Sequence, residues 1–427
     1  MNDLTPSFER ETGQVILDGL SAGVAGEAPL IPVPGLDLAF DRADGRLVRV
    51  VVDTTATDGC ISAGAQTAAT LRNAMLSKLF GAHAPSAIAN PAGAPALSPN
   101  PEFADPLSSL ARLDAARATS PVPPGSPWWA AEAAELAARA GLSTRAGTEA
   151  RRALAKLLGQ LDGSNGAALP EPAIQAALAV AALTAADEPV AAARLRDAMR
   201  GHPRVLPPVS EFDVAAEVES LEKDRVRLGS LHWMFDPDLV PEGLFRPGLS
   251  PYSDLSVSNE SADGAVVVEA VLAPGADCGA LDRCLARLVD PDVRRVLAQA
   301  AFAKTAPDRV QANLKLPFPL DELPESWIEV VQDKLWPVRS AKGHRIRRAL
   351  RWADAALRAE RAPAGLAPHS AHEDWIALAT TAWDRCRRDW GAAGDDERAG
   401  QAARRQAAVG PQPPVDGPAY LAEALGC

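Results

Sequence analysis

A short, strongly basic segment stands out in this otherwise acidic chain. Residues 339–361 contain eight arginines and lysines but only two acidic residues, Asp354 and Glu360, whereas the whole chain of 427 residues has a formal net charge of −12. Guanidinium groups bind carboxylates and phosphates with well-defined geometry, and an indole beside them adds a surface for stacking. The segment therefore predicts a contact with an acidic partner or with a phosphate backbone.

Helical periodicity sorts the side chains of this segment into groups. The apolar stripe on an ideal helix consists of Ile346, Leu350, Ala353 and Leu357. The residues that we predict to bind the partner lie beside that stripe and are Arg345, Arg347, Arg348, Arg351, Trp352 and Arg358. If these arginines are exposed, replacing them changes binding and leaves the melting temperature nearly unchanged. The alternative is a helix that packs on an acidic neighbour of its own, for example residues 211–224.

Other residues are weaker candidates for catalysis or metal binding. Ser21 lies in a G-x-S-x-G pattern, but a nucleophile elbow needs a strand before the serine, and here we expect a helix. A polar group that offers acid–base chemistry, or equally ordinary turns, consists of His232, Asp236, Asp238, Tyr252 and Asp254. The histidines and cysteines show no spacing typical of a metal site, and no phosphate-binding glycine loop occurs. We therefore predict no catalytic residue, no metal and no cofactor.

The composition indicates a globular protein with more than one domain. Apolar residues make up 47% of the chain and charged residues 23%, and 427 residues exceed what one ordinary core holds. A pI near 5.1 argues against a general nucleic-acid coat. Heavy use of arginine, alanine and proline is typical of a GC-rich bacterial genome. The first residues lack a signal-peptide pattern, and the apolar run at residues 173–186 is too short for a bilayer, so we expect a cytoplasmic protein without membrane contact.

We predict a helix-rich α+β fold with several domains. The expected order is a small N-terminal α+β module with a hairpin at residues 1–83, a proline-rich linker at 84–126, a helical bundle at 127–201, an α+β domain with a mixed sheet and helices at 209–320, a helical C-terminal region with the basic helix at 321–408, and a tail at 409–427. Because proline interrupts helices and central strands, we expect the linker to be semi-extended, with at most a short helix at 107–116.

The local patterns also predict individual elements. Residues 5–23 have helical spacing, and residues 36–40 and 46–53 flank a turn that ends in Gly45, which is typical of a hairpin. The strands expected in the second half are 230–235, 254–259, 265–272 and 309–316. The helices expected there are 278–288, 291–302, 325–335, 341–360, 371–390 and 397–407.

These observations favour a non-enzymatic interaction or regulatory protein. Its basic helix would bind a protein partner with an acidic surface. Two other classes stay open, namely a nucleic-acid-associated regulator and an enzyme that uses the region 236–254. The oligomeric state is not determined by the sequence.

Overall fold

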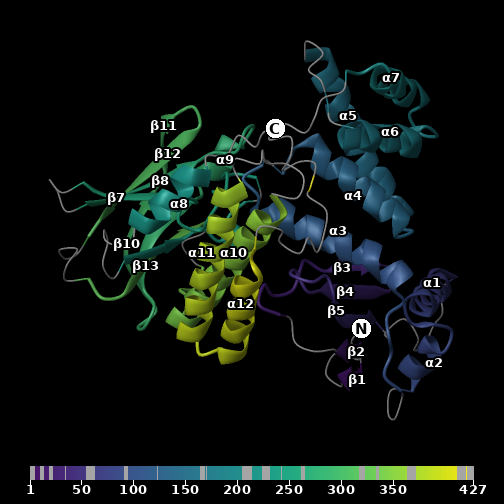
Figure 1. Cartoon of the computed structure of the whole chain (residues 1–427), viewed down its shortest axis with the longest axis horizontal. Coiled ribbons are helices and arrows are strands. Elements are labelled where there is room, and N and C mark those ends of the chain that lie inside the picture. Colours follow the sequence, from purple (N-terminus) through teal and green to yellow (C-terminus); the bar gives the residue numbers. More distant parts are fainter. Residues whose placement is uncertain are drawn as a thin grey trace. The chain divides into compact units, whose positions relative to one another are not determined.

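The computed structural model divides the chain into two units (Figure 1). The first unit comprises Met1–Ala115 and Pro127–Leu206, and the second comprises Ala116–Ser126 and Pro207–Cys427. The residues that the structure describes are 5–9, 14–18, 23–33, 35–53, 63–90, 95–122, 124–163, 169, 171–203, 214–223, 231–241, 243–260, 265–316, 323–332, 336–362, 372–410 and 420. Helices and strands alternate in blocks within both units, which confirms the predicted helix-rich α+β fold.

An antiparallel sheet with the strand order β1-β2-β5-β4-β3 begins the first unit. Its strands are β1 (Thr5–Glu9), β2 (Gln14–Asp18), β3 (Ile31–Val33), β4 (Leu36–Phe40) and β5 (Leu47–Asp53). The predicted hairpin is confirmed, because β4 and β5 pair antiparallel on either side of the turn. Gly45 closes that turn with φ of 71°, and a Cβ there would also collide with Ser108.

The helix that we predicted over residues 5–23 is wrong, because β1 and β2 occupy its described parts. Val15 and Leu17 are buried while Ile16 between them is half-buried, so the apolar residues alternate with the period of a strand. The hydrogen bonds of β2 to β1 on one side and to β5 on the other decide between the two periods.

Helices complete the first unit. They are α1 (Ala63–Phe80), α2 (Ala84–Ala89), α3 (Pro101–Thr119), α4 (Pro127–Arg139), α5 (Ser143–Gly163), α6 (Glu171–Thr184) and α7 (Pro189–Arg200). The last four helices pack on one another as the predicted helical bundle. The last four residues of α3 belong to the second unit. The exact domain boundaries stay a prediction.

The long helix α3 corrects the expectation of a semi-extended, proline-rich segment. Leu107, Leu110 and Ala111 are fully buried and form an apolar stripe at helical spacing. Pro106 lies inside α3 and removes one backbone hydrogen bond of the helix, so the burial of this stripe offsets that cost. The residues that follow the helix are also buried, including Ser120 and Val122. This part of the chain is therefore packed and not an exposed tether.

The second unit contains two four-stranded sheets, with the orders β10-β9-β13-β6 and β11-β12-β8-β7. Its elements are α8 (Val214–Lys223), β6 (Leu231–Met234), the 3-10 turn η3 (Pro237–Leu239), β7 (Ser256–Glu260), β8 (Ala265–Val271), α9 (Cys278–Leu281), β9 (Leu285–Asp290), β10 (Arg295–Ala301), β11 (Ala303–Ala306), β12 (Arg309–Lys315), β13 (Ser326–Val331), α10 (Ala341–Arg361), α11 (His372–Ala392) and α12 (Asp396–Ala408). Neighbouring strands are antiparallel except β6 and β13, which are parallel. Phe302, buried between β10 and β11, marks the point where the chain passes from one sheet to the other.

The two sheets share one hydrophobic core, and β13 shows how they use their faces. Ile328 and Val330 belong to the core that also includes Val268 and Val310 of the other sheet. Side chains alternate along a strand, so Trp327 and Glu329 project from the opposite face. That face meets α10, because the ring of Trp327 stacks on the ring of His344.

Helices α10, α11 and α12 pack in sequence on one another beside the sheets (Figure 1). Trp375, Trp383 and Trp390 are buried along one side of α11. Basic helix α10 begins one residue after its N-cap Ser340, whose Oγ accepts a hydrogen bond from the backbone nitrogen of Gly343 at 3.2 Å. Its bounds agree with the predicted helix at residues 341–360.

Three predicted helices of the second unit are strands. Residues 278–288 and 291–302 contain only the short α9 and otherwise form β9 and β10, and residues 325–335 contain β13. Alanine-rich β10 has good intrinsic helix propensity, but its pairing with β9 overrides it. In β13 the run of Trp327, Ile328 and two valines is typical of a strand, and we gave it too little weight.

The shared core of the two sheets makes a direct prediction about stability. Ile328→Ala removes a fully buried side chain, so we expect the free energy of unfolding of the second unit to fall by about 2–5 kcal/mol. Val293→Ala on the same sheet is the control, because Val293 is 68% exposed and its loss costs less than about 0.5 kcal/mol. Urea unfolding of the full chain measures both values, and equal costs would contradict the packing described here.

Candidate functional site

Burial separates the six predicted binding residues of α10 into two groups. Arg348, Arg351, Trp352 and Arg358 have exposed fractions of 8%, 6%, 0% and 4%, so they face the interior of the second unit. Arg345 and Arg347 are only half-buried. Since an unpaired charge in the interior is very costly, the buried guanidinium groups need acceptors inside the protein.

Arg351 and Arg358 hold the loop before β7 and the end of α3 against the second half of α10. Arg351 makes a bidentate ion pair with Asp254, with both oxygens 2.7 Å from Nη2. Arg358 donates to the carbonyl oxygens of Thr119 at 2.5 Å and Leu249 at 3.3 Å. Thr119 ends α3, so a buried cation lies at the negative end of that helix. Both arginines therefore have a structural role.

Arg348 connects α10 to α11 and to the sheet. Its guanidinium binds both carboxylate oxygens of Asp389 at 2.8 and 2.6 Å and lies 4.4 Å from the ring centre of Trp327. A third nitrogen lies 3.1 Å from Nδ1 of His232. Because a guanidinium only donates, Nδ1 must be the acceptor, and the proton of neutral His232 is on Nε2.

His232 is held in its neutral form. Burial lowers its pKa to about 4, and the positive charge of Arg348 adds to this effect. Its Nε2 faces Glu325 at 3.6 Å, and Glu325 is also bound by Arg345 at 2.7 Å. Nδ1 of His232 is thus held by Arg348, whereas the 3.6 Å between Nε2 and Glu325 is too long for a hydrogen bond.

A second buried cluster lies under the first turn of α10. Arg287 and Glu329 face each other on β9 and β13, and Nε of Arg287 lies 2.6 Å from Glu329. His344, also fully buried, places Nε2 3.1 Å from the other oxygen of Glu329, without good hydrogen-bond alignment. Burial raises the pKa of Glu329 and lowers the pKa of His344 to about 3.

The accessible cations lie at the beginning of α10. Lys342 is exposed, and Arg347 has an exposed side-chain fraction of 39%. Arg347 pairs at 2.7 Å with Asp238, whose side chain is 59% exposed, and lies 3.7 Å from Asp236. Arg339 also pairs with Asp236, and the Asp236 side chain accepts a hydrogen bond from the backbone nitrogen of Asp238 at 3.0 Å.

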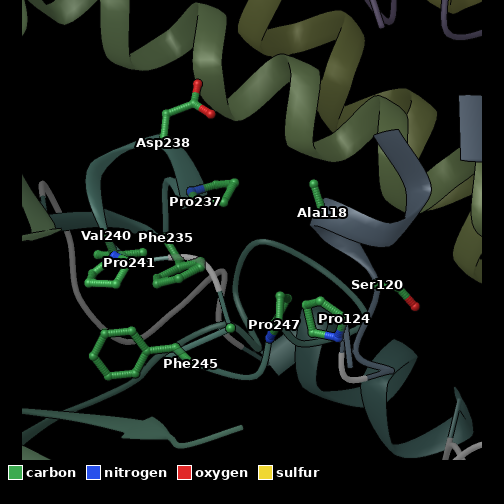
Figure 2. A pocket seen from close by; sticks show the side chains of 11 residues that line it. Ala118, Ser120, Pro124, Phe235, Pro237, Asp238, Val240, Pro241, Phe245 and Pro247 are labelled. Atoms are coloured by element: carbon green, nitrogen blue, oxygen red, sulfur yellow. The ribbon is translucent and has the colours of Figure 1, made fainter. Parts of the chain in front are cut away.

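A small apolar pocket borders this accessible end of α10 (Figure 2). Its volume is about 240 Å³, and Asp238 lines its rim. The other lining residues are Ala118, Ser120, Pro124, Phe235, Pro237, Val240, Pro241, Gly243, Phe245 and Pro247. In Figure 2 the carboxylate of Asp238 points away from the aromatic and proline rings. The Asp238–Arg347 ion pair thus lies beside an apolar cavity and leaves its interior without charge.

The predicted polar group of His232, Asp236, Asp238, Tyr252 and Asp254 does not converge on one point. Asp254 binds Arg351, His232 contacts Arg348, and the Asp236–Asp238 turn contacts Arg347. Tyr252 packs edge-on against Trp352 at a ring distance of 5.4 Å. Ser21 lies outside the described residues. Among the residues that the structure describes, no group of three or more histidine, cysteine or acidic side chains is arranged to hold a metal ion.

Neither the acceptors of α10 nor the pocket could be predicted from the sequence. Acidic partners of α10 that the structure shows are Asp254, Asp389, Glu325 and the 236–238 turn. Prolines at positions 124, 237, 241 and 247 were a visible signal of rigid walls, but nothing in their spacing shows that they meet.

Comparisons with known proteins provide no relative. No protein-family model, no curated protein and no solved structure matches this chain. No helix in the described part of the chain has both the length and the apolar character that a bilayer crossing requires.

The buried ion pairs lead to a prediction that reverses our first expectation for these arginines. Arg351→Ala leaves Asp254 buried without its partner, so we expect the second unit to lose about 3–5 kcal/mol of its free energy of unfolding. Arg387→Ala, which breaks the more exposed pair with Asp384, should cost about 0–1 kcal/mol. Urea unfolding of the full chain compares them.

The double variant Arg351→Met with Asp254→Leu tests the same pair by removing both charges together. Replacing both charges by apolar groups removes the unpaired charge, so the double variant should lose less stability than Arg351→Ala alone. If Arg351→Ala lowers the free energy of unfolding by no more than Arg387→Ala does, Arg351 and Asp254 must be accessible to water.

The neutral histidines predict a loss of stability in mild acid. The ordinary histidine pKa of 6.5 falls to about 4 for His232 and about 3 for His344 in the folded protein. At pH values between the folded-state pKa and 6.5, the unfolded chain binds more protons than the folded chain. The free energy of unfolding is therefore highest above pH 6.5 and decreases as the pH falls. Each histidine contributes a slope of up to roughly 1.4 kcal/mol per pH unit.

Urea unfolding at a series of pH values between 7 and 5 measures this slope. The double variant His232→Gln with His344→Gln should show a flatter dependence on pH, whatever its stability at neutral pH. His83→Gln is the control, since His83 is exposed in the first unit. An unchanged slope in the double variant would mean that both histidines titrate alike in the folded and unfolded states, which would contradict their lowered pKa values.

Proposed function

We propose that this protein is a non-enzymatic interaction or regulatory protein whose second unit binds an acidic protein surface through the exposed beginning of α10. The observation that carries the proposal is the Arg347–Asp238 ion pair, in which both side chains are accessible, at 39% and 59%. An exposed pair of this kind contributes only about 0–1 kcal/mol, so an external carboxylate can replace Asp238 at little cost.

Lys342 and Arg345 add two cations around the first turns of α10, and Arg345 lies on the flank opposite Arg347. Lys342 is exposed, and Arg345 shares the half-exposed Glu325 with His232. The buried arginines at positions 348, 351 and 358 support this surface by fixing α10 on the sheet and on α11. The proposed binding surface therefore keeps only Arg345 and Arg347 of the six residues predicted from the sequence, and Lys342 is added to them.

Two alternatives have less support. A nucleic-acid-associated regulator needs a row of cations facing phosphates, and the arginines at positions 348, 351 and 358 do not provide it because they are buried against acceptors inside the protein. An enzyme that uses His232 as a general base needs an accessible ring, whereas this side chain is only 27% exposed and its Nδ1 is held by Arg348. We place the protein in the cytoplasm, and the free cysteines Cys284 and Cys386 fit a reducing compartment.

A peptide of ten glutamates with a fluorescent label tests the proposal by anisotropy with the full chain. The triple variant Lys342→Gln, Arg345→Gln, Arg347→Gln should bind it about tenfold more weakly, which corresponds to ~1.4 kcal/mol. Salt of about 0.15 M limits the Debye length to ~8 Å, so distant acidic residues of the protein contribute little.

The matched control replaces three exposed cations of the sheets, Arg294, Arg295 and Lys304, by glutamine and should bind like the wild type. If both triple variants lose affinity for the peptide equally, the loss reflects the change in net charge, and the proposal of a local site on α10 is contradicted. Tighter binding of a short duplex DNA than of the peptide, lost in the α10 variant, would favour the nucleic-acid alternative.

A further inference from the structure

We infer that the pocket beside Asp238 receives one apolar side chain of the same acidic partner, a side chain that stands next to the carboxylates that α10 binds. This inference rests on the proposed function and adds a second contact to it. The pocket is lined by aromatic and proline rings, and its only charged lining residue within the described chain is Asp238 (Figure 2).

The size of the pocket selects a single side chain. Pockets for drug-sized molecules have volumes from about 300 Å³ upward, and this one measures about 240 Å³. In Figure 2 Phe235, Phe245 and Val240 lie on one side of it, and Pro124 and Pro247 lie on the other. Proline and phenylalanine walls change little on binding, so an apolar group enters a preformed cavity at a small entropic cost.

The rim explains why the occupant belongs to an acidic segment. Asp238 lines the pocket and is bound to Arg347 on α10 at 2.7 Å. A partner carboxylate that replaces Asp238 as the ligand of Arg347 therefore lies next to the pocket. An apolar residue beside that carboxylate on the same segment can then contact the rings that line the pocket. Asp238 is then solvated, which its exposure of 59% already permits.

Neighbouring interactions keep the pocket in shape. Arg246 donates from Nε to the carbonyl oxygen of Pro121 at 3.0 Å, which fixes the loop that carries Pro124. Phe235 and Phe245 pack edge-on with their ring centres 5.6 Å apart. Asp236 accepts from the backbone of Asp238 and thereby orders the turn at the rim. The cavity is thus built from fixed parts of the second unit.

Two fluorescent acidic peptides test this inference with the full chain. Both carry four glutamates, and the central residue is phenylalanine in one and glycine in the other. Burial of the ring should make the phenylalanine peptide at least about tenfold tighter. The comparison on the wild-type protein needs no variant, so it decides the inference even where a substitution affects folding.

A filled pocket provides the matched variant. Ala118 lines the pocket but is exposed, so Ala118→Phe should occupy the cavity without disturbing the core and should remove the preference for phenylalanine over glycine. Ala407→Phe, at an exposed position of α12, should retain the preference.

The outcomes separate this inference from the proposed function. If both peptides bind the wild type equally and both weaken in the triple α10 variant, the pocket has no role while the α10 surface stands. If a preference for phenylalanine persists in Ala118→Phe, the ring binds elsewhere and the inference is overturned. If neither peptide binds, or binding ignores the α10 variant, both proposals are overturned.

Discussion

The second unit depends on one constraint, which is that a helix rich in arginine lies against a sheet and a second helix. Moving a guanidinium group out of water is costly unless its charge and its hydrogen bonds are matched. Arg348 and Arg351 meet this condition with a bidentate carboxylate each, and Arg358 meets it with backbone carbonyl groups. These acceptors come from α11, the end of α3 and the loop before β7, so the demands of α10 determine which loop and helices must surround it.

This constraint also accounts for the buried ion pair on the outer face of the sheet. The strands send Ile328 and Leu288 into the shared core, while Glu329 and Arg287 lie on the opposite face, next to the apolar cluster of Met234, Val289 and Trp327. These two charges would be costly against a purely apolar helix unless they paired with each other. The stacking of Trp327 with His344 joins the apolar part of this face to α10.

The C-terminal helices could be predicted from the sequence, whereas the residues that α10 contacts could not. The helices α10, α11 and α12 were expected almost at their observed bounds, because strong helical periodicity is a local property. The ion pairs of α10 join residues 97 and 41 positions apart, so no local pattern reveals them. Strand β10 was expected as a helix because its alanines favour a helix locally and only its pairing with β9 makes it a strand. The pocket escaped notice for the same reason, since segments around residues 120 and 240 meet only in the folded unit.

Internal pairing changes the meaning of the charge distribution. The basic segment appears in the sequence as an isolated positive patch, yet most of its charge is matched inside the second unit by Asp254, Asp389, Glu325 and Asp238. A chain with a net charge of −12 therefore presents little compensating positive field to a distant molecule. An acidic partner would meet repulsion at long range and attraction only at contact. Recognition on this surface must then rely on short-range terms, namely the exchange of carboxylates at Arg347 and the burial of an apolar group beside it.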